Sequence, residues 1–147
     1  MQEATSSTLV SSIHFEQSVR GYRTILIIGL VEIFIGSLAL ISNLTALTFD
    51  TNPKDPAVLF FVTLTGTLSA FLGVGLIQFK KFAYQLLLYF SSVIILSKIL
   101  IFLNIIELNG ALDTSIPQSF KDLVSIAYHS FIIYFLTHSE VKKIFKK

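Results

Sequence analysis

Long apolar stretches separated by short polar ones dominate the chain. Three of them cover about residues 24–42, 57–79 and 82–106, and a fourth, shorter one covers about residues 117–137. A helix rises about 1.5 Å per residue, so about 20 apolar residues cross the roughly 30 Å of hydrocarbon in a membrane. The pattern therefore predicts an all-α, polytopic membrane protein whose four transmembrane helices form an antiparallel bundle.

The polar connections agree with a division into four helices. The segments DTNPKDP and ELNGALDTSIP, which precede the second and fourth stretches, are rich in turn-forming residues, and a short basic turn, QFKKF, joins the second stretch to the third. We expect three regions: residues 1–20 as a polar segment that is disordered or interfacial, residues 21–138 as the transmembrane domain, and residues 139–147 as a basic cytoplasmic tail.

Basic residues border the apolar stretches on one side of the predicted membrane. Most of the 11 Lys and Arg fall into three clusters: Arg20 and Arg23; Lys80 and Lys81; and Lys142, Lys143, Lys146 and Lys147. The other side receives the acidic residues Asp50, Asp55, Glu107, Asp113 and Asp122. Short cytoplasmic loops carry the excess of Lys and Arg, so both termini are predicted to be cytoplasmic. The lysine-rich tail also predicts contact with anionic lipid.

Composition supports the membrane class and removes several functions. Hydrophobic residues make up 53% of the 147 residues and charged residues 14%, whereas soluble domains average about 25% charged. The absence of Cys excludes disulfides, zinc–thiolate sites and thiol redox chemistry. No basic surface with stacking aromatic residues is present, so no nucleic-acid partner is expected. We expect no cofactor and no metal.

Three ionisable residues lie inside the predicted spans at similar depth. Glu32 is near the middle of the first span, His129 is near the middle of the fourth, and Lys98 lies about 6 Å from the centre of the third at helical rise. The fourth span also carries Asp122 and Ser125 on the side of His129. Intramembrane ionisable residues commonly pair with one another or mark ion pathways.

Small residues mark the faces where the first two spans can approach closely. Gly29 and Gly36 share the helix face of Glu32, and Gly66, Ala70 and Gly73 form a face of the second span. Small residues let helix backbones approach each other in lipid. These five positions are therefore predicted to be helix-packing residues, and Glu32 is predicted to face the bundle.

The intramembrane residues support a structural and a functional interpretation. In the structural one, Glu32 pairs with Lys98 and His129 bonds to a serine, or Lys98 extends to the interface and Glu32 is simply protonated. The chain would then be a non-enzymatic packing or accessory subunit that associates with copies of itself or with other membrane subunits. In the alternative, Glu32, Lys98 and His129 serve a proton-coupled or ion-conducting transport unit.

An enzyme is the third interpretation, and the sequence offers little for it. There is no H-E-x-x-H, no G-x-S-x-G and no glycine-rich phosphate loop, and the spacing of His129 and His138 is not typical of metal ligands. We therefore expect no enzymatic activity and assign no catalytic residue.

Two stretches resemble recurring parts of small prokaryotic four-helix membrane proteins. GVGLIQFKKFAYQL, residues 73–86, resembles a Gly-x-Gly-Leu, basic turn, aromatic-Ala pattern, and YFLTHSEVKKIF, residues 134–145, resembles the exit of a last helix. Phe82 stands where Trp is common, and His138 and Ser139 stand where Arg-Pro is common. The resemblance covers under a fifth of the chain. It implies a multi-pass protein of a bacterial or archaeal cytoplasmic membrane and implies no activity.

Overall fold

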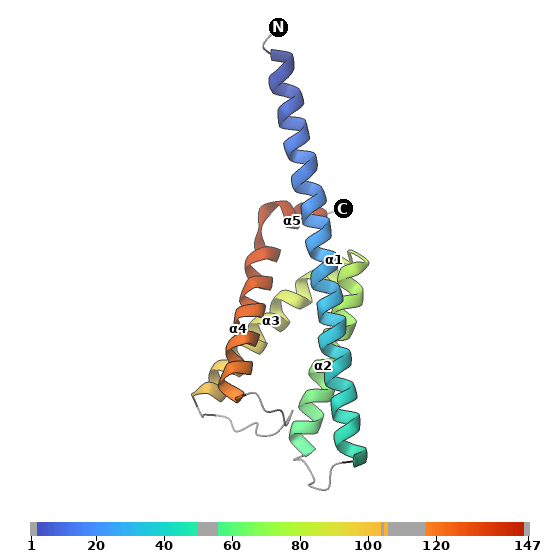
Figure 1. The fold of residues 1–147 in the computed structure, drawn as a ribbon, viewed down its shortest axis with the longest axis vertical. Helices are drawn as coiled ribbons and strands as arrows, with labels where there is room; N and C mark the ends of the chain where they lie inside the picture. Colours follow the sequence, from blue (N-terminus) through green and yellow to red (C-terminus); the bar gives the residue numbers. More distant parts are fainter. Residues whose placement is uncertain (1–2, 50–55, 104, 106–116, 146–147) are drawn as a thin grey trace.

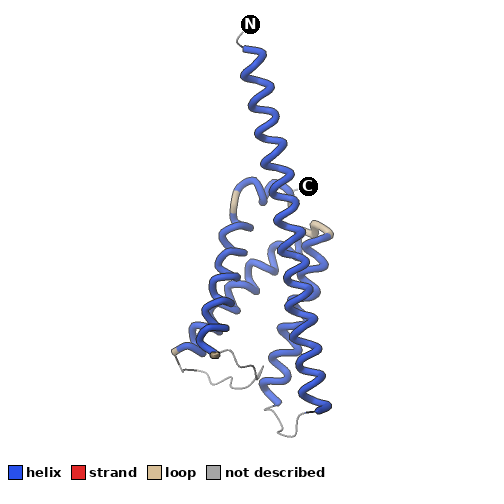
Figure 2. The backbone as a smooth tube through the Cα atoms, in the orientation of Figure 1, coloured by secondary structure: helices blue, strands red, loops and turns tan. Residues whose placement is uncertain are grey.

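The computed structural model describes residues 3–49, 56–103, 105 and 117–145. Every regular element in these ranges is a helix, as Figures 1 and 2 show, which confirms the all-α prediction. The five helices are α1 (Glu3–Phe49), α2 (Pro56–Ile77), α3 (Lys81–Phe102), α4 (Gln118–Thr137) and α5 (Ser139–Ile144). Four of the acidic residues that were predicted to lie opposite the basic clusters are outside the described residues: Asp50, Asp55, Glu107 and Asp113.

Within the described residues, three stretches are long and apolar enough to cross a membrane: Gly21–Thr48, Pro56–Ile77 and Lys81–Phe102. Their outward surfaces carry large apolar side chains, as lipid-facing helices do; Phe34, Phe60 and Tyr89 are each about two-thirds or more exposed. Three of the four predicted spans thus have membrane-compatible helices. The fourth, α4, has the predicted bounds to within a residue but is not among these three stretches.

The first helix is longer than the sequence predicts. It begins at Glu3 and runs without a break to Phe49, and its first part extends beyond the rest of the molecule in Figure 1. Residues 1–20 were expected to be disordered or interfacial; from Glu3 on they are helical, which differs from disorder, and the interfacial alternative stays a prediction. No Gly or Pro interrupts the segment before Gly21, and extending an existing helix costs far less than starting one.

Helices α1 and α2 form a close antiparallel hairpin through their small residues. A Cβ added to Gly36 would lie 2.5 Å from the carbonyl oxygen of Gly66, and one added to Gly73 would lie 2.5 Å from that of Gly29. Nearer the α1–α2 connection, Asn43 Nδ2 donates to Thr63 Oγ1 at 2.6 Å and to the Leu59 carbonyl at 3.0 Å. This hairpin carries all five predicted packing residues, including Ala70, which lies 2.6 Å from the Cβ position of Gly36.

The turn between α2 and α3 has an unusual residue in a left-handed conformation. Phe79 has φ of 53°, and the Phe79 and Lys80 amides donate to the carbonyls of Leu76 and Gly75, the bonding pattern of a Schellman helix end. Glycine normally occupies this position because a side chain costs about 1–2 kcal/mol there. The Phe79 ring compensates by packing edge-on against Tyr22 at 5.2 Å between centroids.

Helix α5 folds back onto the same end of the molecule instead of forming only a basic tail. Val141 and Phe145 are buried, and the Phe145 ring stacks on Tyr84 at 4.7 Å. Lys142 and Lys143 point outward and are exposed. We call this end, which holds α5 and the α2–α3 turn, the turn end. The opposite end, where α1 and α3 finish and α2 and α4 begin, is the loop end.

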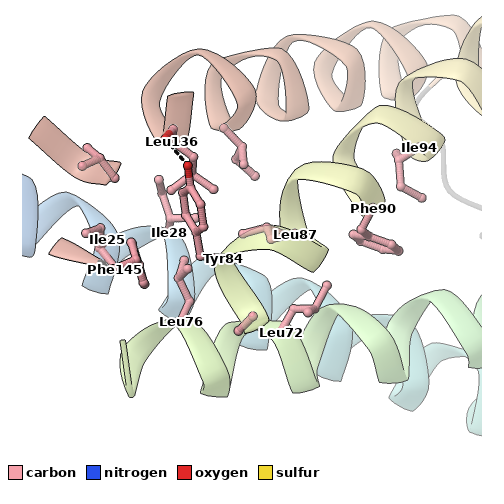
Figure 3. Packing of buried hydrophobic residues seen from close by; sticks show 13 residues of the cluster. Ile25, Ile28, Leu72, Leu76, Tyr84, Leu87, Phe90, Ile94, Leu136 and Phe145 are labelled. Carbon is pink, nitrogen blue, oxygen red and sulfur yellow. Dashed lines mark hydrogen bonds between the residues drawn. The ribbon is translucent and has the colours of Figure 1, made fainter. Parts of the chain in front are cut away.

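The apolar core fills the turn end. Its labelled members in Figure 3 come from α1 to α4 and from the residue that follows α5: Ile25, Ile28, Leu72, Leu76, Tyr84, Leu87, Phe90, Ile94, Leu136 and Phe145. Tyr84 Oη also donates to the Leu136 carbonyl at 3.1 Å, which satisfies an acceptor in the last turn of α4. Towards the loop end, α3 and α4 diverge from α1 and α2 (Figure 1).

Candidate functional site

A cavity of about 220 Å³ lies between the α1–α2 hairpin and the α3–α4 hairpin. It begins at the depth of Glu32 and His129 and extends towards the loop end, where Phe61 and Ile101 belong to its wall. The polar side chains of its lining are Glu32, Thr65, Ser69, Lys98, Ser125 and His129. Four of the five intramembrane candidates therefore line one space, and the fifth, Asp122, contacts Lys98.

Glu32 lies at the inner end of this cavity and is 1% exposed. Its carboxyl oxygens contact two hydroxyl groups from two other helices: Oε2 meets Ser69 Oγ of α2, and Oε1 accepts from Tyr128 Oη of α4 at 3.1 Å. These hydroxyls are the polar partners of the carboxyl group within the described part of the chain, where no basic side chain pairs with it. An uncompensated buried carboxylate would be costly, and the site favours a neutral acid.

The hydrogen bonds around Ser69 favour a protonated acid. Ser69 Oγ lies near two oxygens of Glu32, the carboxyl Oε2 and the main-chain carbonyl oxygen, the latter at 3.0 Å. A serine hydroxyl has one proton and can donate only one of these two bonds. Both form when Ser69 donates to the carbonyl and the Glu32 carboxyl group donates its own proton to Ser69 Oγ. We therefore assign Glu32 as protonated in this arrangement.

His129 lies one residue along α4 from Tyr128 and is 8% exposed. Its Nδ1 is 3.3 Å from Ser91 Oγ of α3, and its ring packs edge-on against Phe90 and Tyr128. The expectation that a serine bonds His129 is met by Ser91. The imidazole thus lines the cavity beside the acid while one ring nitrogen is engaged by a hydroxyl.

Lys98 pairs with Asp122 instead of Glu32. Lys98 Nζ is 2.8 Å from Asp122 Oδ1, the lysine side chain is 25% exposed, and the aspartate side chain is 2% exposed. The hypothesis of a Glu32–Lys98 ion pair is wrong. Lys98 lies four residues before the end of α3 and Asp122 four residues after the start of α4, so an antiparallel pair of helices brings them level.

Ser69, Ser91 and Tyr128 are functional candidates that the sequence interpretation missed. Hydroxyl residues are frequent in membrane helices, and many satisfy their own backbone, as Thr65 does by donating to the Phe61 carbonyl at 2.7 Å. For Tyr128, the sequence did contain a signal: it is the residue directly before His129. Among the described residues, no group of three or more His, Asp and Glu side chains is placed to hold a metal ion.

In comparisons with known proteins, no family model, no curated protein and no solved structure matches the chain.

Proposed function

We propose that the chain is a four-helix integral membrane protein that binds a proton at Glu32 as part of proton-coupled transport. One observation carries the proposal: Glu32, Lys98 and His129, from three different helices, line a single cavity at the depth of the membrane interior. Intramembrane ionisable groups that face a cavity are typical of proton and ion pathways. An acid that is neutral within a hydroxyl cage can release its proton when the cavity fills with water.

The fourth span and the orientation are part of this proposal. Helix α4 has 20 residues, enough to cross the hydrocarbon, and its polar residues Asp122 and His129 face α3 rather than lipid. Arg23 and the lysines of the α2–α3 turn and of α5 all belong to the turn end, so this end is assigned to the cytoplasm. Both termini are then on the cytoplasmic side, and Lys142 and Lys143 contact anionic lipid.

The apolar core at the turn end and the cavity towards the loop end together define a direction for the pathway. Glu32 lies where the cavity stops and the apolar core begins, so a proton reaches it from the loop end while the turn end is closed by Leu76, Leu87 and Leu136. The structure therefore corresponds to a state open to one side. Transport to the cytoplasm requires the two hairpins to part at the turn end.

The accessory-subunit interpretation has less support from the geometry. The small residues that could have served contacts with other subunits are used inside the chain, between α1 and α2. The remaining outward surfaces carry large apolar side chains suited to lipid or to a second copy of the chain. A purely structural role is the conclusion to adopt if Glu32 proves to have no influence on transport.

Proton movement in proteoliposomes tests the proposal. The full chain is reconstituted with a pH-sensitive dye inside, and an outside-acid pH step is applied with the membrane potential clamped. We expect internal acidification faster than in empty liposomes, lost in Glu32→Gln and retained in Glu140→Gln, which changes an exposed acid paired with Lys143. Equal rates in the wild type and Glu32→Gln, with both folded, would contradict the proposal.

A further inference from the structure

The surroundings of Glu32 supply oxygen atoms suited to a cation as well as to a proton. The carboxyl oxygens and Ser69 Oγ meet at the inner end of the cavity, and Thr65 adds a hydroxyl one helical turn away on the same wall. Thr65 and Ser69 use their protons to donate to main-chain carbonyls, so their oxygen lone pairs are available. Hard cations bind oxygen ligands of this kind in proteins.

The charges around the cavity select a monovalent ion. Helix α2 contributes no ionisable group to the lining; α3 contributes Lys98, which Asp122 of α4 neutralises; and α4 contributes His129, bonded to Ser91. Tyr128 of α4 lies outside the lining and donates to Glu32 Oε1. One carboxylate with one monovalent cation is neutral, as the protonated acid is. A divalent cation would leave a net positive charge at a buried acid within a mainly apolar wall, which is costly.

We infer that Glu32, Ser69 and Thr65 bind a small alkali cation, Na⁺ or Li⁺, in exchange for the carboxyl proton of Glu32. The step balances as one proton released to the cavity for each cation bound, with no covalent bond other than O–H broken. The inference rests on the proposed function, because it uses the same acid, and it names the ion that the proton is coupled to.

The hydrogen bonds allow this exchange with little rearrangement. Tyr128 donates to Oε1 and Ser69 donates to the Glu32 carbonyl in both states. Only the proton between Oε2 and Ser69 Oγ is replaced, and both of these oxygens then turn lone pairs towards the cation. The carboxylate moves into the adjacent cavity to admit the larger ion, and the volume of about 220 Å³ leaves room for water ligands.

Carbodiimide labelling distinguishes the exchange from proton binding alone. N,N′-dicyclohexylcarbodiimide is lipid-soluble and reacts with protonated carboxyl groups, so the labelling rate of Glu32 in the reconstituted full chain reports its proton. The rate is measured by intact mass and peptide mapping in NaCl, LiCl, KCl or N-methylglucamine chloride at equal ionic strength and pH. Glu32→Gln identifies the labelled position.

We expect Na⁺ and Li⁺ to slow labelling of Glu32, and N-methylglucamine to leave it unchanged. Because one cation replaces one proton, the Na⁺ concentration for half-protection should fall about tenfold for each pH unit of increase. Ser69→Ala should still be labelled but need more Na⁺ for protection, whereas Ser92→Ala, which removes an exposed hydroxyl on α3, should behave as wild type.

Labelling of Glu32 at the same rate in all four salts would overturn the cation site and leave the proton site standing. Equal protection by K⁺ would overturn the preference for a small ion. Failure of Glu32 to react at any pH, in protein that remains folded, would overturn the proton site as well. The two proposals therefore fail in different ways.

Discussion

Gly36→Ala tests the packing that holds Glu32 and Ser69 together. Gly36 lies one helical turn from Glu32, and the added Cβ would be 2.5 Å from the Gly66 carbonyl oxygen and 2.6 Å from the Ala70 amide nitrogen. Ordinary contacts of this kind are 3.4–4 Å. Both obstructing atoms belong to the α2 backbone, so no side chain can rotate to make space. Helices α1 and α2 must separate by about 1 Å.

The expected cost follows from two opposing effects. Overpacking of a well-packed contact costs about 1–3 kcal/mol. Replacing glycine by alanine within a helix returns about 0.5–1 kcal/mol through lower backbone entropy of the unfolded chain. Because two backbone atoms obstruct the new Cβ, the overpacking cost is at the upper part of its range, about 2–3 kcal/mol, and the variant should be about 1–2.5 kcal/mol less stable than wild type.

Unfolding by sodium dodecyl sulfate in mixed micelles, followed by near-ultraviolet circular dichroism of the tyrosines, measures this difference. Gly21→Ala is the matched control, because its Cβ would meet only the Cδ1 atom of Ile144 at 3.3 Å, the end of a flexible side chain. We expect Gly21→Ala to stay within about 0.5 kcal/mol of wild type. A Gly36→Ala protein as stable as the control would refute the close contact between α1 and α2.

Three further substitutions test other contacts by the same unfolding measurement. Lys98→Met should destabilise more than the Lys98→Met/Asp122→Asn double variant, because the single change leaves a buried carboxylate facing a thioether; equal losses would argue against the ion pair. Tyr84→Phe should cost about 1 kcal/mol through loss of the hydroxyl that bonds the end of α4, and an unchanged midpoint would exclude that bond. Asn43→Leu should cost about 1–3 kcal/mol, since it removes two hydrogen bonds that join α1 to α2, each contributing about 0.5–1.5 kcal/mol; a stabilised protein would contradict the interaction.

Two separate variants, each with one introduced cysteine, test the orientation, since the chain has no native cysteine. In intact cells, Lys80→Cys at the turn end should not react with a membrane-impermeant maleimide. It should react only after the cells are permeabilised. Ile105→Cys, exposed at the loop end, should react from outside. The reverse pattern would invert the proposed topology, and labelling of both from one side would remove α3 as a span.

The positions of α2 and α4 were predictable because the length and hydropathy of their stretches define them closely. The second predicted stretch, 57–79, corresponds to Pro56–Ile77, and the fourth, 117–137, to Gln118–Thr137. The third was expected to reach residue 106, but α3 ends at Phe102. Apolar residues continue past that point, and hydropathy cannot distinguish a helix from an apolar connection.

The partners of the polar residues were harder to predict, because depth in the membrane does not fix which helix faces which. Glu32 and Lys98 were predicted at similar depth, but they have different partners. The Glu32 carboxyl group contacts Ser69 and Tyr128, whereas the Lys98 ammonium group pairs with Asp122. Counting residues from the ends of α3 and α4 would have shown that Lys98 and Asp122 are level. No comparable count identifies Ser69, because it depends on how α1 and α2 rotate against each other.

The helical character of residues 139–144 was also missed, although the sequence contained a signal for it. Val141 and Phe145 are four residues apart with Lys142 and Lys143 between them, an amphipathic spacing that buries the first pair and exposes the second. The four lysines of the segment favoured a solvated tail instead. A basic segment can thus hold a helix against the bundle while its charges remain at the interface.

The place of α5 in the chain determines when the fold can be completed during synthesis. Phe79 takes up its left-handed conformation beside Tyr22, but Phe145, at 6.3 Å on its other side, is translated 66 residues later. At about 5–20 residues per second that delay lasts roughly 3–13 seconds. For that time the turn end lacks the Phe145 ring, so its aromatic packing can be completed only after α5 has been synthesised.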